Sequence, residues 1–433
     1  MERILTNKLK YNVGKTVFLE GWIHNLRRLG DINFLIIRDR GGLAQAVMSV
    51  EDLKPVEGLQ LGTVVSLEGT VVTAPQAPGG VELHDSKIEV ITPVIEPLPL
   101  PINKTKLKAN QQFFLDHAVV GHRHPRQQAL FRLSAGIMRG FRETLHSKDF
   151  VEIQTPKLVA SATESGANLF GVEYFGRTAF LAQSPQFYKQ IMVGVFERVY
   201  EVAPVFRAEK HATGRHLNEY VSLDLEMGFI KDHYDVTALL TELLHGVLNL
   251  VKDEYAEDID LLNVQWPALN KSIPHIHIVD AQQLLAETYG VTDAVGEPDL
   301  TPRHETLLGE WAKEKYKSDY LFVTGYPMSK RPFYTHPDHD RPGYSNGFDL
   351  LFRGLELVTG GQRLHKYEDY IDAAIKYGYH IEPFETYFEA FKHGMPPHGG
   401  FAIGLERFLM QLLDIDNIRM ATLFPRDRNR LTP

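Results

Sequence analysis

The sequence predicts an α+β protein in which a small all-β barrel precedes a larger domain of helices and strands. Three observations carry this prediction. Residues 15–92 alternate between apolar and polar side chains in five short runs, which is the pattern of strands with one buried face. Residues 92–106 are rich in proline, which favours an extended segment. Long amphipathic segments, typical of helices, appear only beyond residue 113.

The five apolar and polar runs are separated by Gly, Asp and Pro, and they read TVFLEGWIHNL, DINFLIIRDR, GLAQAVMSV, TVVSLEGTVVTA and SKIEVIT. Five short strands within so few residues predict a small barrel, for which the OB-fold is the leading candidate. The prolines that follow predict a linker. We therefore expect a barrel domain over residues 1–95, a linker over 96–113 and a second domain over 114–433.

The second domain combines two kinds of periodicity. Residues 129–150 and 235–255 show the spacing of amphipathic helices. Between these helices, residues 198–209 and 220–229 alternate in the manner of two strands joined by a loop. The second domain is therefore expected to contain antiparallel strands packed against helices.

Composition excludes several kinds of protein. The 433 residues are 43% hydrophobic and include no cysteine. Disulfides and thiolate zinc sites are therefore excluded. A site for a hard cation such as Mg²⁺, which binds oxygen ligands, is not excluded. The N-terminus has no apolar leader, and no apolar run approaches the roughly 18 residues that a membrane helix needs. We expect a cytoplasmic protein with no membrane segment. Because the net charge is -9, any nucleic-acid binding must come from a local patch.

The two predicted strands over 198–209 and 220–229 would each carry one polar face. On the second strand, period two places Leu223 and Leu225 on one face and Asp224 and Glu226 on the other. The apolar face would pack on helices, and the polar face would lie beside the connecting loop. That loop is suited to grip a polyanion such as a triphosphate, because it holds Lys210, His211, Arg215 and His216.

Three stretches together resemble a known family. The segment FRAE with its loop and return strand, at residues 198–228, resembles motif 2 of the class II aminoacyl-tRNA synthetases. Residues 399–413 resemble motif 3, and residues 141–158 resemble motif 1, which builds the dimer interface in that family. The resemblance is to archaeal-type aspartyl enzymes of subclass IIb over nearly the whole chain. It implies an antiparallel class II sheet with helices, preceded by an OB-fold anticodon-binding domain.

The resemblance assigns roles around ATP. Arg207 would act catalytically by neutralising charge at the α-phosphate, and Glu209 would place the adenine amino group. Glu356 and Thr359, in LELVTGG, match the family's positions for Mg²⁺. Phe229 is near enough in sequence to be a candidate for stacking on adenine. The outer phosphates would be held by Arg215, His216 and Arg407, with Glu356 also counted among the ATP-binding residues.

The resemblance also assigns an aspartate pocket. Lys189 and Arg363 match the two residues that bind the side-chain carboxylate, whereas an asparagine pocket would need an acceptor for the amide. A polar site left unpaired by the wrong substrate discriminates strongly, so the two cations favour aspartate. Gln186 would flank the substrate. Its α-ammonium group would be bound by Glu164 and Asp224.

Four residues of the barrel match anticodon contacts. Phe34 would stack on the central uridine, and Gln45 would form a hydrogen bond with it. His24 and Pro78 lie where archaeal-type enzymes vary with tolerance of the third anticodon base, and their pairing resembles the relaxed kind. Whether tRNA(Asn) is charged in addition to tRNA(Asp) stays open.

The resemblance therefore implies a homodimeric aspartate–tRNA ligase with Mg²⁺ as cofactor. It would activate L-aspartate with ATP to aspartyl-adenylate and transfer the aspartyl group to the 3′-terminal adenosine of the tRNA. Three alternatives stay open. They are an asparaginyl-tRNA synthetase, an asparagine synthetase derived from the same catalytic domain, and a tRNA-binding protein without catalysis.

Overall fold

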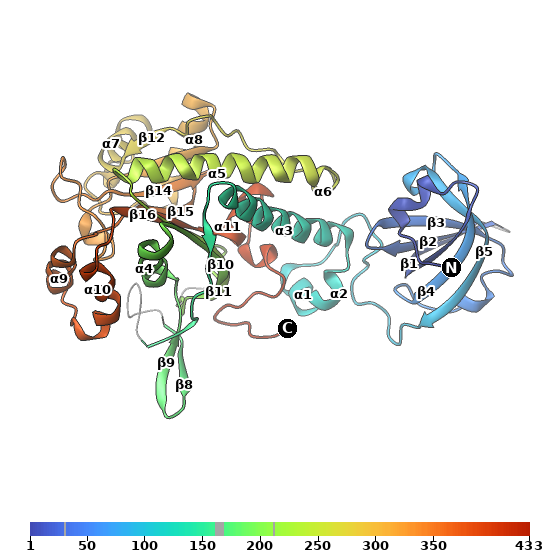
Figure 1. The fold of residues 1–433 in the computed structure, drawn as a ribbon. Helices are drawn as coiled ribbons and strands as arrows, with labels where there is room; N and C mark the ends of the chain where they lie inside the picture. Colours follow the sequence, from blue (N-terminus) through green and yellow to red (C-terminus); the bar gives the residue numbers. More distant parts are fainter. Residues whose placement is uncertain (30–31, 161–168, 211–212) are drawn as a thin grey trace. The chain divides into compact units, whose positions relative to one another are not determined.

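The computed structural model describes residues 1–29, 32–160, 169–210 and 213–433. These residues form two compact units, Met1–Gln127 and Gln128–Pro433, and each is described by itself (Figure 1). None of the helices within the described ranges combines the length and the apolar character needed to cross a membrane.

The first unit contains a closed five-stranded barrel with strand order β1-β2-β3-β5-β4. Alternate residues such as Leu35, Ile37, Ala44 and Ala46 fill its core, as period two requires. The predicted all-β barrel is therefore confirmed. Its strands are β1 (Thr16–Leu29), β2 (Ile32–Asp39), β3 (Gly42–Met48), β4 (Val64–Thr73) and β5 (Val81–Thr92).

The segment after the barrel contains bends and turns, including a hydrogen bond from the N–H of Lys104 to the carbonyl of Pro101. Residues 93–110 contain no helix or strand, and two short helices follow, α1 (Gln111–Asp116) and α2 (Ala118–Gly121). These helices belong to the first compact unit, which continues to Gln127. The division of the chain at residues 95 and 113 stays a prediction.

The second unit is built on an eight-stranded sheet with the order β12-β13-β14-β15-β16-β11-β10-β6. Neighbouring strands are antiparallel except in the pairs β12·β13 and β10·β6, so the predicted α+β class is confirmed. The strands are β6 (Val151–Glu152), β10 (Arg198–Phe206), β11 (Glu219–Gly228), β12 (His275–His277), β13 (Tyr320–Thr324), β14 (Gly347–Phe352), β15 (Leu355–Gln362) and β16 (His398–Gly404). A separate three-stranded sheet holds β7 (Leu158–Val159), β8 (Gly171–Tyr174) and β9 (Arg177–Leu181).

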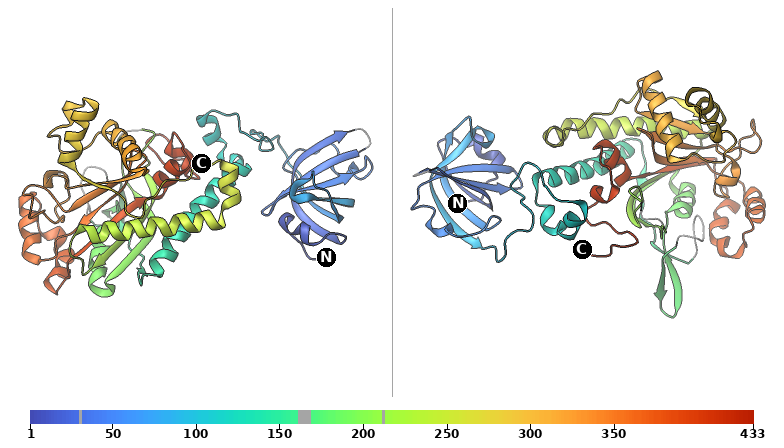
Figure 2. Two further views of the ribbon diagram at one scale, coloured as in Figure 1. Left: turned by 90° about the horizontal axis from the view of Figure 1, so that it is seen from above. Right: turned by 180° about the vertical axis from the view of Figure 1, so that it is seen from behind.

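Two long helices, α3 (Pro125–His146) and α5 (His233–Glu254), lie side by side against one face of this sheet (Figure 2). A β-carbon at Gly140 would lie only 2.9 Å from the Cα of Val247, so glycine lets the two helices approach closely. Both helices match the amphipathic segments predicted from the sequence.

The opposite face of the sheet carries a second apolar cluster. Val199 of β10 packs in it with α4 (Gln186–Phe196), α9 (Tyr367–Lys376) and α10 (Glu385–Lys392), whereas the next residue, Tyr200, packs with α3 and α5. The remaining helices are α6 (Ala256–Leu262), α7 (Ile278–Tyr289), α8 (Pro302–Tyr316) and α11 (Leu405–Leu412).

The predicted hairpin forms between β10 and β11, with Glu201 opposite Asp224. Leu223 and Leu225 are buried in the core with α3 and α5, as predicted. The first strand is shorter than expected, because β10 ends at Phe206. Arg207 therefore begins the connecting loop, where its N–H donates to the carbonyl of Asn218.

Candidate functional site

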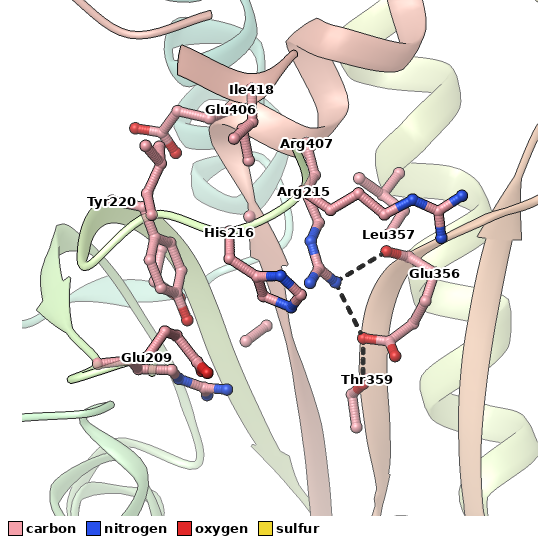
Figure 3. A pocket seen from close by; sticks show the side chains of 15 residues that line it. Glu209, Arg215, His216, Tyr220, Glu356, Leu357, Thr359, Glu406, Arg407 and Ile418 are labelled. Carbon is pink, nitrogen blue, oxygen red and sulfur yellow. Dashed lines mark hydrogen bonds and ion pairs between the residues drawn. The ribbon is translucent and has the colours of Figure 1, made fainter. Parts of the chain in front are cut away.

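A cavity of about 270 Å³ opens on the polar face of the hairpin, beside β15, β16 and the start of α11. Figure 3 shows Tyr220 and Glu209 on one side and Glu356 and Thr359 on the other, with Arg407 between them. Apart from Phe229, the candidate for stacking on adenine, the cavity brings together every residue predicted to bind ATP. Its polar lining consists of Arg207, Glu209, Arg215, His216, Tyr220, Ser222, Glu356, Thr359, Glu406 and Arg407.

The floor of this polar face is formed by small residues of β16. Ala402 pairs with Asp224 of β11 on one side and with Thr359 of β15 on the other. A β-carbon at Gly400 would lie 2.4 Å from the Oε2 atom of Glu226. The alternation in GGFAIG thus buries Phe401 in the core. On the polar face it places small residues, so charged side chains of neighbouring strands can lie close to the backbone of β16.

One wall of the cavity offers two adjacent oxygens for a metal ion. Arg407 donates from Nη1 to the carbonyl and to Oε1 of Glu356, at 3.1 and 3.2 Å. The hydroxyl of Thr359 lies 3.2 Å from the same Oε1. Hard oxygen ligands that leave positions for water and phosphate suit Mg²⁺. In the described part of the chain no cluster of three or more acidic or histidine side chains could hold a metal, so Mg²⁺ here would depend on phosphate oxygens.

Ionisable groups around the cavity have shifted pKa values. Burial, reinforced by the charge of Arg407, lowers the pKa of His216, which favours a neutral imidazole beside the arginines. Burial followed by the charge of Glu356 raises the pKa of Glu305 to about 7. Burial also raises the pKa of Glu406 to about 7, although its carboxylate accepts the N–H of Val221.

Deeper on the same face, four charged side chains form a buried network. The Nζ atom of Lys189 lies 3.0 Å from Asp224 Oδ1 and 3.4 Å from Glu226 Oε2. Arg363 donates from Nε to Glu226 Oε1 at 2.9 Å and from Nη2 to the carbonyl of Gly400 at 3.0 Å. Two cations and two anions balance one another, which is the condition under which buried charges are tolerated.

The two cations of this network differ in how they are used. Lys189 donates hydrogen bonds to Asp224 and to the carbonyl of Phe401 and forms an ion pair with Glu226, so its ammonium group has three protein partners. Arg363 uses Nε and Nη2, and its Nη1 forms no hydrogen bond with the described residues. Although burial alone would raise the pKa of Glu226, the charges of Arg363 and Lys189 hold it below its ordinary value. Arg363 is therefore held in place, and the two N–H donors of its Nη1 are available for a ligand.

The network and the cavity belong to one continuous face. Ser222 lines the cavity and donates a hydrogen bond to Asp224 in the network. Gln186 is buried and donates to Gln190 at 3.0 Å. Glu164, which was predicted to bind the α-ammonium group, lies outside the described residues.

Among the residues of the site that have no role in the sequence-based prediction are Tyr220, Glu226 and Glu305. Tyr220 lines the cavity and presents a ring near Arg207, whereas Phe229 does not line it and is 70% exposed. Tyr220 shares the period-two face of Asp224 and Glu226, so strand periodicity contains the signal for it. Glu226 was placed on this face without a function, and Glu305 carries no local sequence signal.

On the barrel, Phe34 and Gln45 lie on adjacent strands, β2 and β3, as predicted. Phe34 is half-buried and does not belong to the barrel core, so its ring is not explained by core packing. Gln45 is buried and donates to Glu82 Oε2 at 2.8 Å. Its amide is therefore fixed in orientation.

His24 and Pro78 occupy different kinds of position. His24 lies beside an irregularity in β1 and is 8% exposed. Burial and then the charge of Arg38 lower its pKa to about 4, so the imidazole is neutral. Pro78 is half-buried and begins the short η3 turn (Pro78–Gly80) that leads into β5.

Two family models match the chain. One, described as OB-fold nucleic acid binding domain, covers residues 17–91. The other, described as tRNA synthetases class II (D, K and N), covers residues 110–428, which is more than half of the chain. The chain belongs to this family of class II tRNA synthetases. The resemblance drawn from the three motifs is confirmed, and the family generally uses Mg²⁺ with ATP.

Individual class II synthetases resemble the chain over its full length. The aspartate–tRNA(Asp/Asn) ligase of Thermus thermophilus is 49% identical, with 100% of both chains covered. The ligase of the same name from Deinococcus radiodurans is 46% identical, covering 100% of this chain and 99% of its own. Among solved structures, the asparaginyl-tRNA synthetase of Pyrococcus horikoshii complexed with asparaginyl-adenylate has a TM-score of 0.92 at 31% identity, covering 100% of both chains.

Proposed function

We propose that this class II synthetase is an aspartate–tRNA ligase, which activates L-aspartate with ATP and transfers it to tRNA(Asp). The observation that carries the proposal is the position of Arg363. Its buried guanidinium is held by Glu226 and Gly400, and its Nη1 forms no hydrogen bond with any residue that the structure describes. It lies on the sheet face that also carries the cation-lined cavity. This arrangement suits a small amino acid with a side-chain carboxylate beside a triphosphate.

ATP would lie in the cavity between Tyr220 and the wall formed by Glu356. The base would stack on the ring of Tyr220, and Glu209 would bind its amino group. The phosphates would meet Arg207, Arg215 and Arg407. Mg²⁺ bound at Glu356 and Thr359 would neutralise charge on the phosphate oxygens.

The first step needs positioning more than proton transfer. An oxygen of the aspartate α-carboxylate attacks the α-phosphorus, the new O–P bond forms, and the bond to the β-phosphate oxygen breaks, so pyrophosphate leaves. Arg207 offsets the charge that develops on the α-phosphate oxygens. In the second step the 3′-hydroxyl of the terminal adenosine attacks the aspartyl carbonyl, and AMP leaves with the bonding electron pair.

Selection of aspartate follows from the buried network. The α-ammonium group would bind near Asp224, and the side-chain carboxylate would bind Arg363 Nη1. Asparagine would present a neutral amide to the same guanidinium and leave it without an anion. The two ligases named for aspartate are also more similar to this chain than the solved asparaginyl enzyme, at 49% and 46% identity against 31%.

Charging of tRNA(Asn) as well as tRNA(Asp) is part of the proposal. It is supported by the names of the two relatives, which include both tRNAs, and by the presence of His24 and Pro78 at the predicted positions. We further propose that the enzyme is a homodimer joined through motif 1, in which α3 leads to the edge strand β6.

The deciding experiment measures ATP–pyrophosphate exchange with L-aspartate and with L-asparagine, followed by aminoacylation of tRNA(Asp) and tRNA(Asn) transcripts. Exchange that requires aspartate, with charging of both tRNAs, supports the proposal. Charging of tRNA(Asp) alone removes its tRNA(Asn) part. Exchange with asparagine alone favours the asparaginyl alternative, and absence of any exchange favours a tRNA-binding protein without catalysis.

A further inference from the structure

The carboxylate of Glu305 joins two separate parts of the ATP cavity. Its Oε2 atom accepts the backbone N–H of Glu356 at 3.2 Å and lies 3.6 Å from Nη1 of Arg215. Glu305 belongs to α8, which is outside all three motifs, and its side chain is only 12% exposed. One side chain thus touches the loop that reaches the phosphates and the strand that carries the candidate Mg²⁺ ligand.

Contact between two glycines brings Glu305 within reach of β15. A β-carbon at Gly309 of α8 would lie 2.5 Å from the backbone nitrogen of Gly354, in the turn between β14 and β15. A β-carbon at Gly354 would lie 2.7 Å from the Cα of Thr306. The helix therefore rests directly on the turn, and Glu305, one residue before Thr306, is fixed opposite the start of β15.

Glu305 bonds to β15 at an irregular point of the strand. Glu356 pairs with Leu351 and Val358 pairs with Leu350, so Leu357 is an extra residue between them. Such a bulge changes the direction of neighbouring side chains. The N–H of Glu356 is tied to Glu305, and the carbonyl and carboxylate of Glu356 both accept from Arg407. The orientation of Glu356 therefore depends on Glu305 as well as on Arg407.

We propose that Glu305 is a positioning residue for activation of the amino acid. It holds the backbone of Glu356 so that its carboxylate faces the metal and phosphates, and it holds Arg215 at the outer phosphates. This inference rests on the proposed function, because it assigns Glu305 a role in binding Mg²⁺ and ATP. Glu305 does not line the cavity itself and acts through Glu356 and Arg215.

Two substitutions separate the two contacts. Glu305→Gln keeps an oxygen for the Glu356 N–H but removes the charge that attracts Arg215, whereas Glu305→Ala removes both. The matched control is Glu310→Gln, on an exposed position of the same helix. Folding of each variant is checked by thermal unfolding, and the near-isosteric Gln variant remains informative if the Ala variant fails to fold.

The readout is aspartate-dependent ATP–pyrophosphate exchange at varied ATP and varied Mg²⁺. Glu305→Ala should lower kcat/KM for ATP by roughly 10- to 100-fold, as expected for loss of a residue that orients a metal ligand, and should raise the Mg²⁺ concentration that gives half-maximal rate. Glu305→Gln should need nearly the same Mg²⁺ concentration as the wild type for half-maximal rate. Its kcat/KM for ATP should fall, but by less than in Glu305→Ala. KM for aspartate should stay unchanged in both, and Glu310→Gln should match the wild type.

A double-substitution cycle tests the link to Arg215. If Glu305 holds Arg215, then Arg215→Ala should cost less in the Glu305→Gln background than in the wild type. Additive losses, an Ala variant as active as Glu310→Gln, or an effect confined to aspartate would each overturn the inference. If the wild type shows aspartate-dependent exchange, these results bear on Glu305 alone. If the wild type shows no exchange, the proposed function fails and this inference fails with it.

Discussion

Replacing Arg363 by methionine removes a buried guanidinium and keeps an unbranched side chain in place of its aliphatic stem. Glu226, which is fully buried, would lose the ion pair at 2.9 Å and keep only Lys189 at 3.4 Å, which already serves Asp224. Removing one partner of a buried ion pair costs about 3 to 5 kcal/mol, because the remaining charge stays without compensation. We expect the free energy of unfolding to fall by this amount.

The same substitution should act on catalysis in a selective way. Without the guanidinium, the side-chain carboxylate of aspartate has no cation at that position, and discrimination at such sites is roughly 10⁴ or more. We therefore expect kcat/KM for aspartate to fall by about this factor. KM for ATP should change little, since Arg363 does not line the cavity.

The assay combines urea unfolding with ATP–pyrophosphate exchange at a temperature where the variant is folded. The control is Arg353→Met, because Arg353 also pairs with a buried carboxylate, Asp319, and donates to two backbone carbonyls. It should lose stability and keep its aspartate parameters. Adding Glu226→Gln to Arg363→Met should recover part of the lost stability but not the aspartate activity. An unchanged kcat/KM for aspartate in Arg363→Met would refute the assignment of this residue.

Three further predictions concern other parts of the molecule. Glu406→Gln should change how the free energy of unfolding depends on pH. The pKa of the Glu406 carboxyl is about 7 in the folded protein and 4.5 ordinarily, so the protonated carboxyl stabilises the fold fully below pH 4.5. About 3 kcal/mol of this stabilisation is lost as the pH rises toward 7. Between pH 5 and pH 8, the free energy of unfolding measured with urea should fall less in Glu406→Gln than in the wild type. An equal fall in both proteins would contradict this prediction. Tyr220→Ala should weaken ATP binding by roughly 1 to 3 kcal/mol while Tyr220→Phe does not, as measured by KM in exchange; equal effects would exclude stacking. Phe34→Ala should weaken tRNA binding by roughly 1 to 3 kcal/mol with normal exchange, and an unchanged KM for tRNA would remove Phe34 from the anticodon site.

Much of the fold follows from short-range periodicity. The alternation of β2 and β3 places Leu35 and Ala46 in the barrel core, and the alternation of β11 separates Leu223 in the core from the polar face. Such alternation predicts which residues are buried, because each strand packs one face against the core. The sequence did not predict that β10 ends at Phe206. The N–H of Arg207 donates a hydrogen bond to the carbonyl of Asn218, and this bond depends on how the loop between β10 and β11 folds.

The candidate site was less predictable where long-range packing decides. The sequence places Lys189 and Arg363 in one pocket by resemblance. It does not show that Lys189 contacts Asp224, Glu226 and Phe401, whereas Nη1 of Arg363 forms no hydrogen bond with the described residues. The sequence did not predict that Glu305 lies at the site, because its position depends on the contact between Gly309 and Gly354. No local pattern reports a contact between a helix and a distant turn.

The contrast between the two halves of the polar face explains how one sheet can serve both substrates. At the buried end, Asp224 and Glu226 balance the charges of Lys189 and Arg363, and under the proposed function aspartate would bind Nη1 of Arg363. At the open end, Arg207 and Arg407 line a solvent-accessible cavity, where ATP would supply the negative charge. Because Gly400, Ala402 and Gly404 form the floor between them, no long side chain rises from β16 between the two ends. Under the proposed function, the α-carboxylate of aspartate and the α-phosphate of ATP would meet above β16, the strand that both halves share.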